Sequence, residues 1–396
     1  MKKSVLVIYG CLIALLMSCE EIVDWQPGTD DIAPGTISNI QVQNLAGAAK
    51  ITYDLPLDED VVAVEAVYTI NGQPKKVTAS VYTNSLTVEG FGSTESRTIR
   101  LYSVDRSQNY SSPVEVTINP LTPPIVSVFN SIEMEAGFGG VFLQWDNPTE
   151  ADISLWLLME DETGTMAEKE TIYTSANSGR FNFRGMEPVA KKFGIYVRDR
   201  WNNFSDTLYM TLTPLFEEEL DSRAFQRLVL PRDENDAGQF GNMFDGNIAV
   251  GMYTTVDVNA SPMFFTIDLG KPVLLSRYKL WHRQANPYNN ASPKLWKVYG
   301  TLSPDVNNTD PDYWVNGYQQ DWVLLSDVSD ISQYKPSGDE FQNTAEDLAA
   351  ALAGFDMDFR GDAVPVRYLR FEISENWALP TRSVIGELAF FGTSVN

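Results

Sequence analysis

Hydrophobic and polar residues alternate along several short stretches of the chain. The alternation is clear at positions 51–55, 62–70 and 141–145, where every second residue is aliphatic or aromatic. Successive side chains of a strand point to opposite faces of a sheet, so this period of two is typical of strands with one buried face. Turn residues such as Asn71-Gly72 separate the stretches. The pattern predicts an all-β chain built from short strands.

The alternating stretches belong to an internal repeat. ITYDLP at 51–56 is matched by LQWDNP at 143–148, which places Tyr53 opposite Trp145 at an offset of 92. YSVDRSQNYSS at 102–112 is matched by YVRDRWNNFSD at 196–206 at an offset of 94, and LTP recurs at an offset of 91. Three separated blocks at nearly one spacing indicate a duplicated module of about 92 residues. We expect β-sandwiches at 36–122 and 123–215, with Tyr53 and Trp145 in their cores and no chemistry in either copy.

These repeated blocks resemble fibronectin type III modules, in the aromatic-x-x-Pro after the second strand and in the Asp-x-x-x-Asn-x-Ser block near the end. The resemblance implies two tandem immunoglobulin-like sandwiches that act as spacers.

A charged break, FEEEL at 216–220, precedes a region of different character. It contains six ordered blocks: NMFDGN at 242–247, a long apolar stretch at 264–283, PKLWKVYGTLSPD at 293–305, DWVLLSD at 321–327, VRYLRFEISENW at 366–377 and VIGELAFFG at 384–392. In this order they resemble the discoidin, or coagulation factor 5/8 type C, domain, a galactose-binding-like jelly-roll sandwich that includes many carbohydrate-binding modules. We place this domain at 221–396. Pro304 to Asp321 reads as an insertion, and Thr344 to Gly354 as an alanine-rich helix with a Thr cap and a terminal Gly.

The N-terminus has a basic start at Lys2 and Lys3, followed by thirteen mostly apolar residues from Val5 to Met17. A membrane-spanning helix needs roughly 20 such residues, so the run is typical of a cleaved secretory signal, here residues 1–18. Leu16 to Cys19 also resembles the lipobox of bacterial lipoproteins, which implies lipidation of Cys19. The alternative is an ordinary signal with Cys19 incidental. Glu20 and Glu21 resemble a surface-export signal of glycan-foraging Gram-negative anaerobes, and 19–35 reads as a tether.

Composition fits a protein outside the cytoplasm. Of the two cysteines, Cys11 leaves with the signal, so the mature chain cannot form an internal disulfide. Removing Lys2 and Lys3 changes the formal net charge from −24 to −26, which disfavours nucleic acid and anionic lipid as partners.

Catalytic constellations are scarce. With one histidine, His282, and no free thiol, Cys-His catalysis and multi-histidine metal sites are excluded. Paired carboxylates could serve a glycosidase, but pairs close in sequence are common among 53 acidic residues. We therefore do not expect an enzyme.

Sugar binding needs an exposed aromatic ring for the apolar pyranose face and side chains that hydrogen-bond to hydroxyls. The discoidin resemblance implies a ligand site on three loops, here 249–255, 282–293 and 375–383. The stacking candidates are Tyr253, Tyr288 and Trp377, and the hydrogen-bonding candidates are His282, Arg283, Asn286, Asn289 and Arg382. Burial as a loop anchor is the alternative for each ring, and a structural hydrogen-bonded role is the alternative for His282. Trp281, Trp296 and Trp322 are assigned to the core; Tyr313, Trp314 and Tyr318 either fill the core or extend the platform.

The same resemblance implies one structural Ca²⁺, bound by Asp245 of the DG turn and Glu387 of the last strand. Ca²⁺ takes six to eight oxygen ligands, so carbonyls near Phe244 and Asn247 would have to contribute. Val250 stands where the family usually has a hydroxyl residue. The alternative is a structural turn in which backbone amides satisfy Glu387.

Together these features predict an outer-membrane lipoprotein that faces the cell exterior and binds an oligo- or polysaccharide without catalysis. The resemblance implies a polysaccharide-utilisation system and a glycan transporter complex as a further partner. The alternatives are an adhesion or scaffold protein that binds another protein through the same loops and, third, a glycoside hydrolase.

Overall fold

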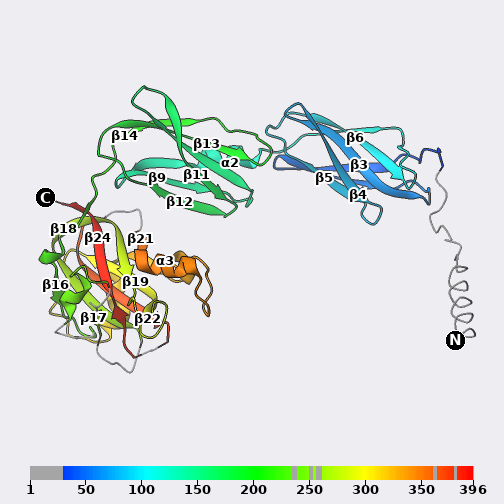
Figure 1. Ribbon diagram of the computed structural model, residues 1–396. Coiled ribbons are helices and arrows are strands. Elements are labelled where there is room, and N and C mark those ends of the chain that lie inside the picture. The colour runs from blue at the N-terminus through cyan, green and yellow to red at the C-terminus, as the bar shows by residue number, and fades with distance from the viewer. Residues whose placement is uncertain are drawn as a thin grey trace, which may run out of the picture.

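The computed structural model describes residues 30–233, 239–248, 253–255, 261–359, 364–378 and 381–395. Within them the chain forms three β-rich modules in sequence order (Figure 1). The predicted all-β class is confirmed. Cys19 and the signal sequence lie outside the described residues.

The first two modules have the same topology. The strands of the first module are β1 (Ser38–Leu45), β2 (Ala48–Asp54), β3 (Val61–Ile70), β4 (Gln73–Ser80), β5 (Ser85–Glu89), β6 (Arg97–Asp105) and β7 (Val114–Ile118). Those of the second are β8 (Glu133–Gly137), β9 (Gly140–Asp146), β10 (Ile153–Glu160), β11 (Met166–Thr174), β12 (Ser178–Phe183), β13 (Lys191–Asp199) and β14 (Leu208–Leu212). Sheets β1-β2-β5 and β4-β3-β6-β7 in the first correspond to β8-β9-β12 and β11-β10-β13-β14 in the second. The repeat predicted from the sequence is therefore a repeat of fold.

The repeated Asp-x-x-x-Asn block has the same local structure in both copies. Asp105 accepts hydrogen bonds from the backbone and side-chain nitrogens of Asn109 at 2.8 and 2.9 Å. Asp199 accepts the matching pair from Asn203 at 2.9 and 2.7 Å. These bonds close the turn after the sixth strand of each module. The Asp-x-x-x-Asn spacing that recurs in the two copies therefore has a structural role.

The second module contains a helix that the alternation did not predict. Helix α2 (Pro124–Ser131) begins with Pro at its first turn and packs Ile125 and Val128 into the core against β9 and β13. Pro at the first helical turn is favourable because its missing N–H has no intrahelical partner there. The expectation that the module is all strand is wrong at this position.

The third module is a two-layer sandwich in which one long strand serves both layers. Its strands are β15 (Glu218–Glu219), β16 (Gln226–Leu228), β17 (Tyr253–Thr254), β18 (Met263–Trp281), β19 (Pro293–Thr301), β20 (Val323–Val328), β21 (Phe355–Asp358), β22 (Val366–Asn376), β23 (Val384–Ile385) and β24 (Glu387–Ser394). The first half of β18 pairs with β16 and β22, and the second half with β21 and β24. Gly270, at φ 82, lies where the strand changes sheet. Phe265 and Phe371 from one layer and Leu280 and Phe390 from the other share a core.

Short helices connect these strands. They are η1 (Ser222–Ala224), η2 (Phe240–Met243), η3 (Tyr313–Gly317), η4 (Tyr318–Gln320), η5 (Ile331–Gln333) and α3 (Ala345–Ala353). Helix α3 has the predicted Thr344 cap, which forms a capping box with Asp347, and ends at Gly354 with φ 84.

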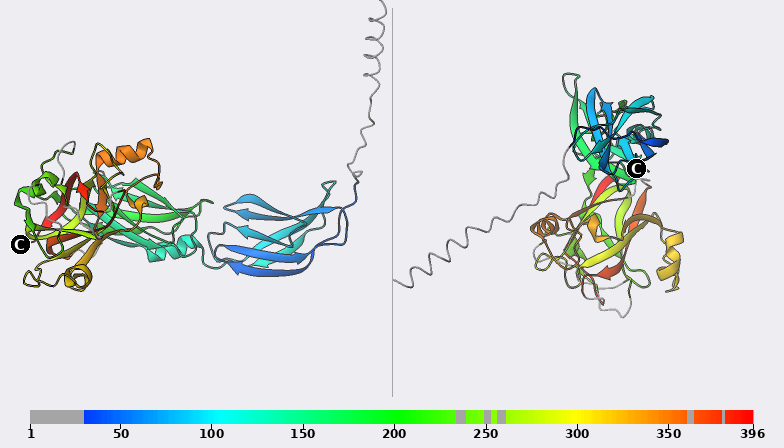
Figure 2. Two further views of the ribbon diagram at one scale, coloured as in Figure 1. Left: turned by 90° about the horizontal axis from the view of Figure 1, so that it is seen from below. Right: turned by 90° about the vertical axis from the view of Figure 1, so that its right-hand side faces the viewer.

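Contacts join consecutive modules. Trp201 of the second module packs on the core of the first, and Asn203 donates a 3.0 Å hydrogen bond to the Gly90 carbonyl. The charged break at 216–220 is not a free linker, because Glu218–Glu219 pairs with β24 and Glu217 accepts a 2.6 Å hydrogen bond from Ser276. Arg184 of the second module binds Asp358 of the third at 2.6 Å. Figure 2 shows the first two modules end to end and the third against the second.

Candidate carbohydrate-binding site

The described residues of the three expected loops are joined at one pole of the third module. The Thr255 amide donates to the Ser383 carbonyl at 3.0 Å, and β17 pairs with β23. Trp377 and Ala378 donate backbone hydrogen bonds to Ser292 and Asn290 at 3.1 and 2.8 Å. Backbone bonds thus connect the segment around 253–255, the loop 282–293 and the loop after β22.

His282 lies inside this pole and is fully buried. Its Nδ1 accepts the Tyr288 backbone N–H at 3.2 Å, so Nε2 carries the proton and donates to the Pro293 carbonyl at 2.9 Å. The imidazole therefore bridges the middle and the end of the loop that it begins. Burial lowers the pKa of His282 to about 3. The expected ligand contact is corrected to the structural alternative, because the ring has no exposed surface.

Tyr288 is also buried, at 6% exposure, which corrects its expected role as an exposed stacking ring. Its ring lies 5.6 Å from that of Phe355 and parallel to Tyr334, and its hydroxyl donates to the Asp347 carbonyl at 2.9 Å. Burial raises its pKa. The chain from Tyr334 to Phe355, including α3, covers this ring. Tyr288 therefore packs beneath the surface of the pole and stabilises its loops.

Trp377 is partly buried and contacts the Tyr288 ring edge-on at 5.5 Å. It thus combines an anchoring contact with a partly exposed side chain. Asn286, Asn289 and Arg382 are exposed and Arg283 is partly exposed. The Tyr253 side chain lies outside the described residues. The loops that carry or contact Trp377 therefore expose amide and guanidinium groups.

Two lysines beneath this surface were missed from the sequence. The side chain of Lys335 is fully buried, with Nζ 5.3 Å from the Trp377 ring and 5.2 Å from the Tyr288 ring. It donates to the carbonyls of Asp339 and Gln342, the latter at 2.7 Å. Lys294 lies 5.7 Å from the Trp377 ring and binds Glu375 at 2.7 Å. No sequence pattern marks these residues, because they approach Trp377 only through the tertiary fold.

Asp347 anchors the covering segment. It lies 3.9 Å from Lys335, and both side chains are fully buried. Burial opposes its ionisation, but hydrogen bonds from Thr344 and Ser337 outweigh burial and lower the pKa of Asp347 to about 2.

The residues expected to bind Ca²⁺ fit a hard cation. Glu387 Oε1 accepts the Gly246 N–H at 3.0 Å, but the buried Oε2 has no hydrogen-bond partner among the described residues. Burial raises the pKa of Glu387 to about 7, and the negative charge of Asp245 contributes to the rise. A divalent cation would satisfy Oε2 and offset the repulsion between the two carboxylates. The turn-only alternative leaves one buried oxygen unsatisfied. Val250 lies outside the described residues.

The insertion at Pro304 to Asp321 contributes aromatic side chains to the interior of the third module and does not extend the binding surface. Trp314 and Tyr318 are fully buried around Arg370, whose guanidinium lies 5.3 and 5.0 Å from their rings. Arg370 binds Asp233 and donates to Thr266 at 3.0 Å. Burial raises the pKa of Asp233. Trp296 and Trp322 are buried as expected, and Trp281 is partly buried.

No helix within the described residues is long and apolar enough to cross a membrane. Three protein-family models, each described as a domain of unknown function, match in tandem: DUF4959 at residues 34–120, DUF5126 at 121–223 and DUF5000 at 242–392. No curated protein sequence matches the chain.

Among solved structures, the chain is similar to a SusE-like protein, BT2857, at 29% identity and a TM-score of 0.44, over 69% of this chain and 100% of that one. It is similar at 18% identity and a TM-score of 0.31 to CBM32-3 from a family 31 glycoside hydrolase of Clostridium perfringens, over 44% of this chain and 95% of that one. A two-domain fibronectin type III segment of chicken tenascin matches at 14% identity and a TM-score of 0.23, over 45% and 99% of the two chains.

Proposed function

We propose that the chain is an outer-membrane lipoprotein, anchored through Cys19 and facing the cell exterior, that binds a glycan non-catalytically through the pole of its third module. The observation that carries the proposal is the backbone bonding of Trp377 and Ala378 to the 282–293 loop, with Asn286, Asn289 and Arg382 exposed on these two loops. Amide and guanidinium groups form paired hydrogen bonds with vicinal hydroxyls, and an indole ring packs against an apolar sugar face. Polysaccharide capture for a transporter complex is the role that this binding would serve.

The buried layer beneath the pole supports the same proposal. His282 holds the 282–293 loop by hydrogen bonds on both ring nitrogens, and Tyr288 packs under Trp377. A binding surface whose backbone is fixed in advance loses less conformational entropy when a flexible oligosaccharide binds. Asp245 and Glu387 would hold one Ca²⁺ and stabilise the turn at 245–246 in a structural role.

A non-catalytic role is supported by the placement of the titratable groups. The chain's single histidine is buried and neutral near pH 7. Among the described carboxyl groups, the pKa values of Asp233 and Glu387 are raised, and both side chains are buried. Neither offers an exposed acid for a glycosidic oxygen.

The test is glycan-array screening of the soluble mature chain from Asp24 onward, followed by titration of the strongest glycan. Asn286→Ala and Arg382→Ala should each weaken binding at least about five-fold, close to 1 kcal/mol. Asn307→Ala and Arg223→Ala, which alter exposed residues of the same types elsewhere in the third module, should leave binding unchanged. Equal losses in the control variants, or binding of a protein ligand and no glycan, would reject the proposal and favour the adhesion alternative.

A further inference from the structure

The outer face of the four-stranded sheet in the second module carries three aromatic side chains, Trp156, Tyr173 and Tyr196, which we call the aromatic group. The fold of the module does not require Trp156 or Tyr173. On β10, Leu155 and Leu157 point into the core, so Ser154 and Trp156 lie on the opposite face. Trp156 pairs across the sheet with Tyr196, and Ser154 pairs with Tyr173 on one side and Arg198 on the other. Tyr173 is 76% exposed.

These side chains hold one another in place. The Trp156 and Tyr196 rings are parallel within 5°, with centroids 5.9 Å apart. The Arg198 guanidinium lies 5.6 Å from the Trp156 ring. Its Nε donates a 3.0 Å hydrogen bond to Asn202 Oδ1, which holds the guanidinium in place. Trp156 Nε1 donates to Ser154 Oγ at 2.9 Å. The indole is therefore fixed in orientation without being buried, which is the condition for a preorganised stacking surface.

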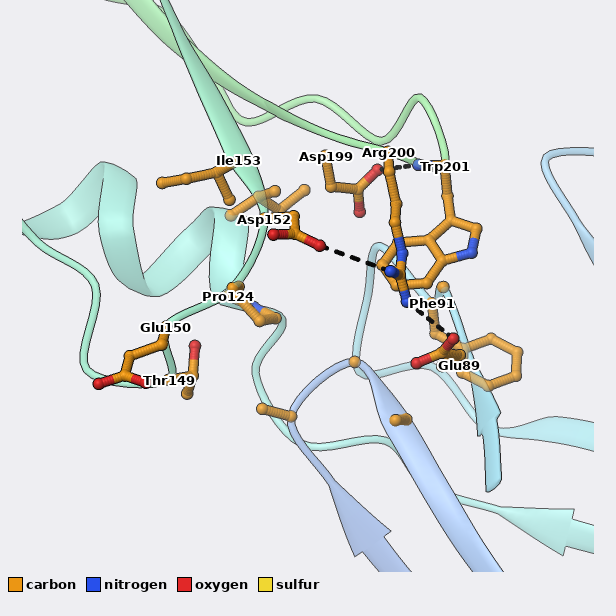
Figure 3. Close-up of a pocket in the computed structure, with 16 residues that line it drawn as sticks. Glu89, Phe91, Pro124, Thr149, Glu150, Asp152, Ile153, Asp199, Arg200 and Trp201 are labelled. Carbon is orange, nitrogen blue, oxygen red and sulfur yellow. Dashed lines mark hydrogen bonds and ion pairs between the residues drawn. The ribbon is translucent and has the colours of Figure 1, made fainter. Parts of the chain in front are cut away.

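A cleft adjoins this aromatic group. It has a volume of about 580 Å³ and is lined by aromatic, hydroxyl and charged side chains: Asp152, Trp156, Tyr173, Ser175, Arg198 and Arg200. Ligand pockets commonly measure about 300–1,000 Å³. Asp152 and Arg200 also line a second cleft of about 320 Å³ at the joint with the first module (Figure 3). The two clefts share four lining residues, Asp152, Ile153, Asp199 and Arg200, so a chain of several sugar rings could extend from one to the other.

The first module provides an internal comparison. The cross-strand pairing places Ala63, Glu65 and Ser80 where the second module has Ser154, Trp156 and Tyr173. Val104 occupies the position of Arg198. Tyr196 has a counterpart in Tyr102. Since the two modules have the same sheet order although the first lacks counterparts of Trp156, Tyr173 and Arg198, these three side chains are not needed to build the sandwich.

We propose that the outer face of the second module, centred on Trp156 and Tyr173, is a second carbohydrate-binding site that takes a neutral oligosaccharide. The rings provide a surface for the apolar face of a pyranose, and Asp152, Ser175 and Asn202 offer hydrogen bonds to its hydroxyls. We expect a neutral ligand because the charges that line the cleft balance, with Asp152 and Asp199 against Arg198 and Arg200. Arg200 also binds Glu89 at 2.9 Å and lies 3.5 Å from Asp152. Figure 3 shows Arg200 between these two carboxylates. This proposal is independent of the one for the third module.

The experiment uses the mature chain from Asp24 with Asn286→Ala and Arg382→Ala in place, so that binding at the third-module pole is weakened. The probes are cellohexaose, maltohexaose, mannohexaose and xylohexaose, titrated by tryptophan fluorescence and saturation-transfer NMR. Trp156→Glu and Tyr173→Ser give the second module the residues of the first, which the shared fold accommodates. Each should weaken the binding of at least one hexasaccharide about five-fold or more. Tyr82→Ser, which removes a 95% exposed tyrosine of the first module, should change nothing.

Binding that is unchanged in both variants, or the absence of any binding that depends on Trp156 and Tyr173, overturns the proposal. Circular dichroism and thermal unfolding check that Trp156→Glu folds; if it does not, Tyr173→Ser decides, because that side chain is exposed. The third-module proposal is tested separately by restoring Asn286 and Arg382 and measuring glycan binding again. If restoring them does not strengthen binding, that proposal fails, but any dependence of binding on Trp156 still stands.

Discussion

The burial of His282 predicts a pH-dependent stability of the third module, which carries the candidate carbohydrate-binding pole. Its pKa is lowered to about 3 in the folded chain, against about 6.5 for an exposed histidine. Between about pH 3 and pH 6.5, His282 is therefore neutral in the folded state and protonated in the unfolded state. The corresponding stability is complete above about pH 6.5 and is lost as the pH falls toward 3.

The size of the effect follows from the shift. One pKa unit corresponds to about 1.36 kcal/mol. Since pH 5 lies about 1.5 units below the pKa of the unfolded state and above that of the folded state, the free energy of unfolding falls by about 2 kcal/mol at pH 5. Glu387 acts in the opposite direction in this pH range, because its pKa is raised to about 7. The contribution of His282 must therefore be read as a difference between two chains that share Glu387.

The assay is urea unfolding of the mature chain at pH 7 and pH 5, followed by tryptophan fluorescence, in the wild type and in His282→Gln. Five of the nine tryptophans lie in the third module, so its transition dominates the signal. Gln keeps a donor and an acceptor but does not titrate. Between pH 7 and pH 5 the wild type should lose about 2 kcal/mol more than His282→Gln. Parallel pH profiles of the two chains would refute the assignment of a neutral, buried imidazole.

Three further predictions concern the third module and the anchor. Tyr288→Phe, which removes the hydroxyl bonded to the Asp347 carbonyl, should destabilise the third module by about 1 kcal/mol and spare glycan binding; a selective loss of binding would return Tyr288 to the ligand site. Chelation with EDTA should lower the melting temperature of the wild type but not of Glu387→Gln, and identical scans with and without EDTA would argue against Ca²⁺. Cys19→Ala should release the chain from the membrane fraction or leave the precursor unprocessed, whereas unchanged palmitate labelling would exclude lipidation at Cys19.

Local patterns predicted the two repeated modules, whereas the fold of the third was inferred from its resemblance to the discoidin domain. The period-two alternation specifies strands, and the offset between Tyr53 and Trp145 identified two copies whose sheets have the same order. The Thr344 cap and Gly354 end of α3 were predictable because a helix end is determined by residues adjacent in sequence. Helix α2 was missed because it has only eight residues, and Ile125 and Val128 are too few buried positions to show a helical period.

The candidate site was predicted less fully, because burial is a property of tertiary contacts. The sequence placed Tyr288 and His282 in a surface loop, and nothing near them shows that residues 334–355 fold over them. Lys335 approaches Trp377 from more than forty positions away for the same reason. Trp156 was overlooked because the alternation that identified its strand does not distinguish an aromatic residue on the outer face from one that serves the core.

The most direct test of the central claim is a crystal structure of the mature chain with the glycan that binds it most strongly. We expect a sugar ring at the pole of the third module, in contact with Trp377 and within hydrogen-bond distance of at least two of Asn286, Asn289 and Arg382. Electron density for the glycan only elsewhere on the chain, with this pole empty, would contradict it.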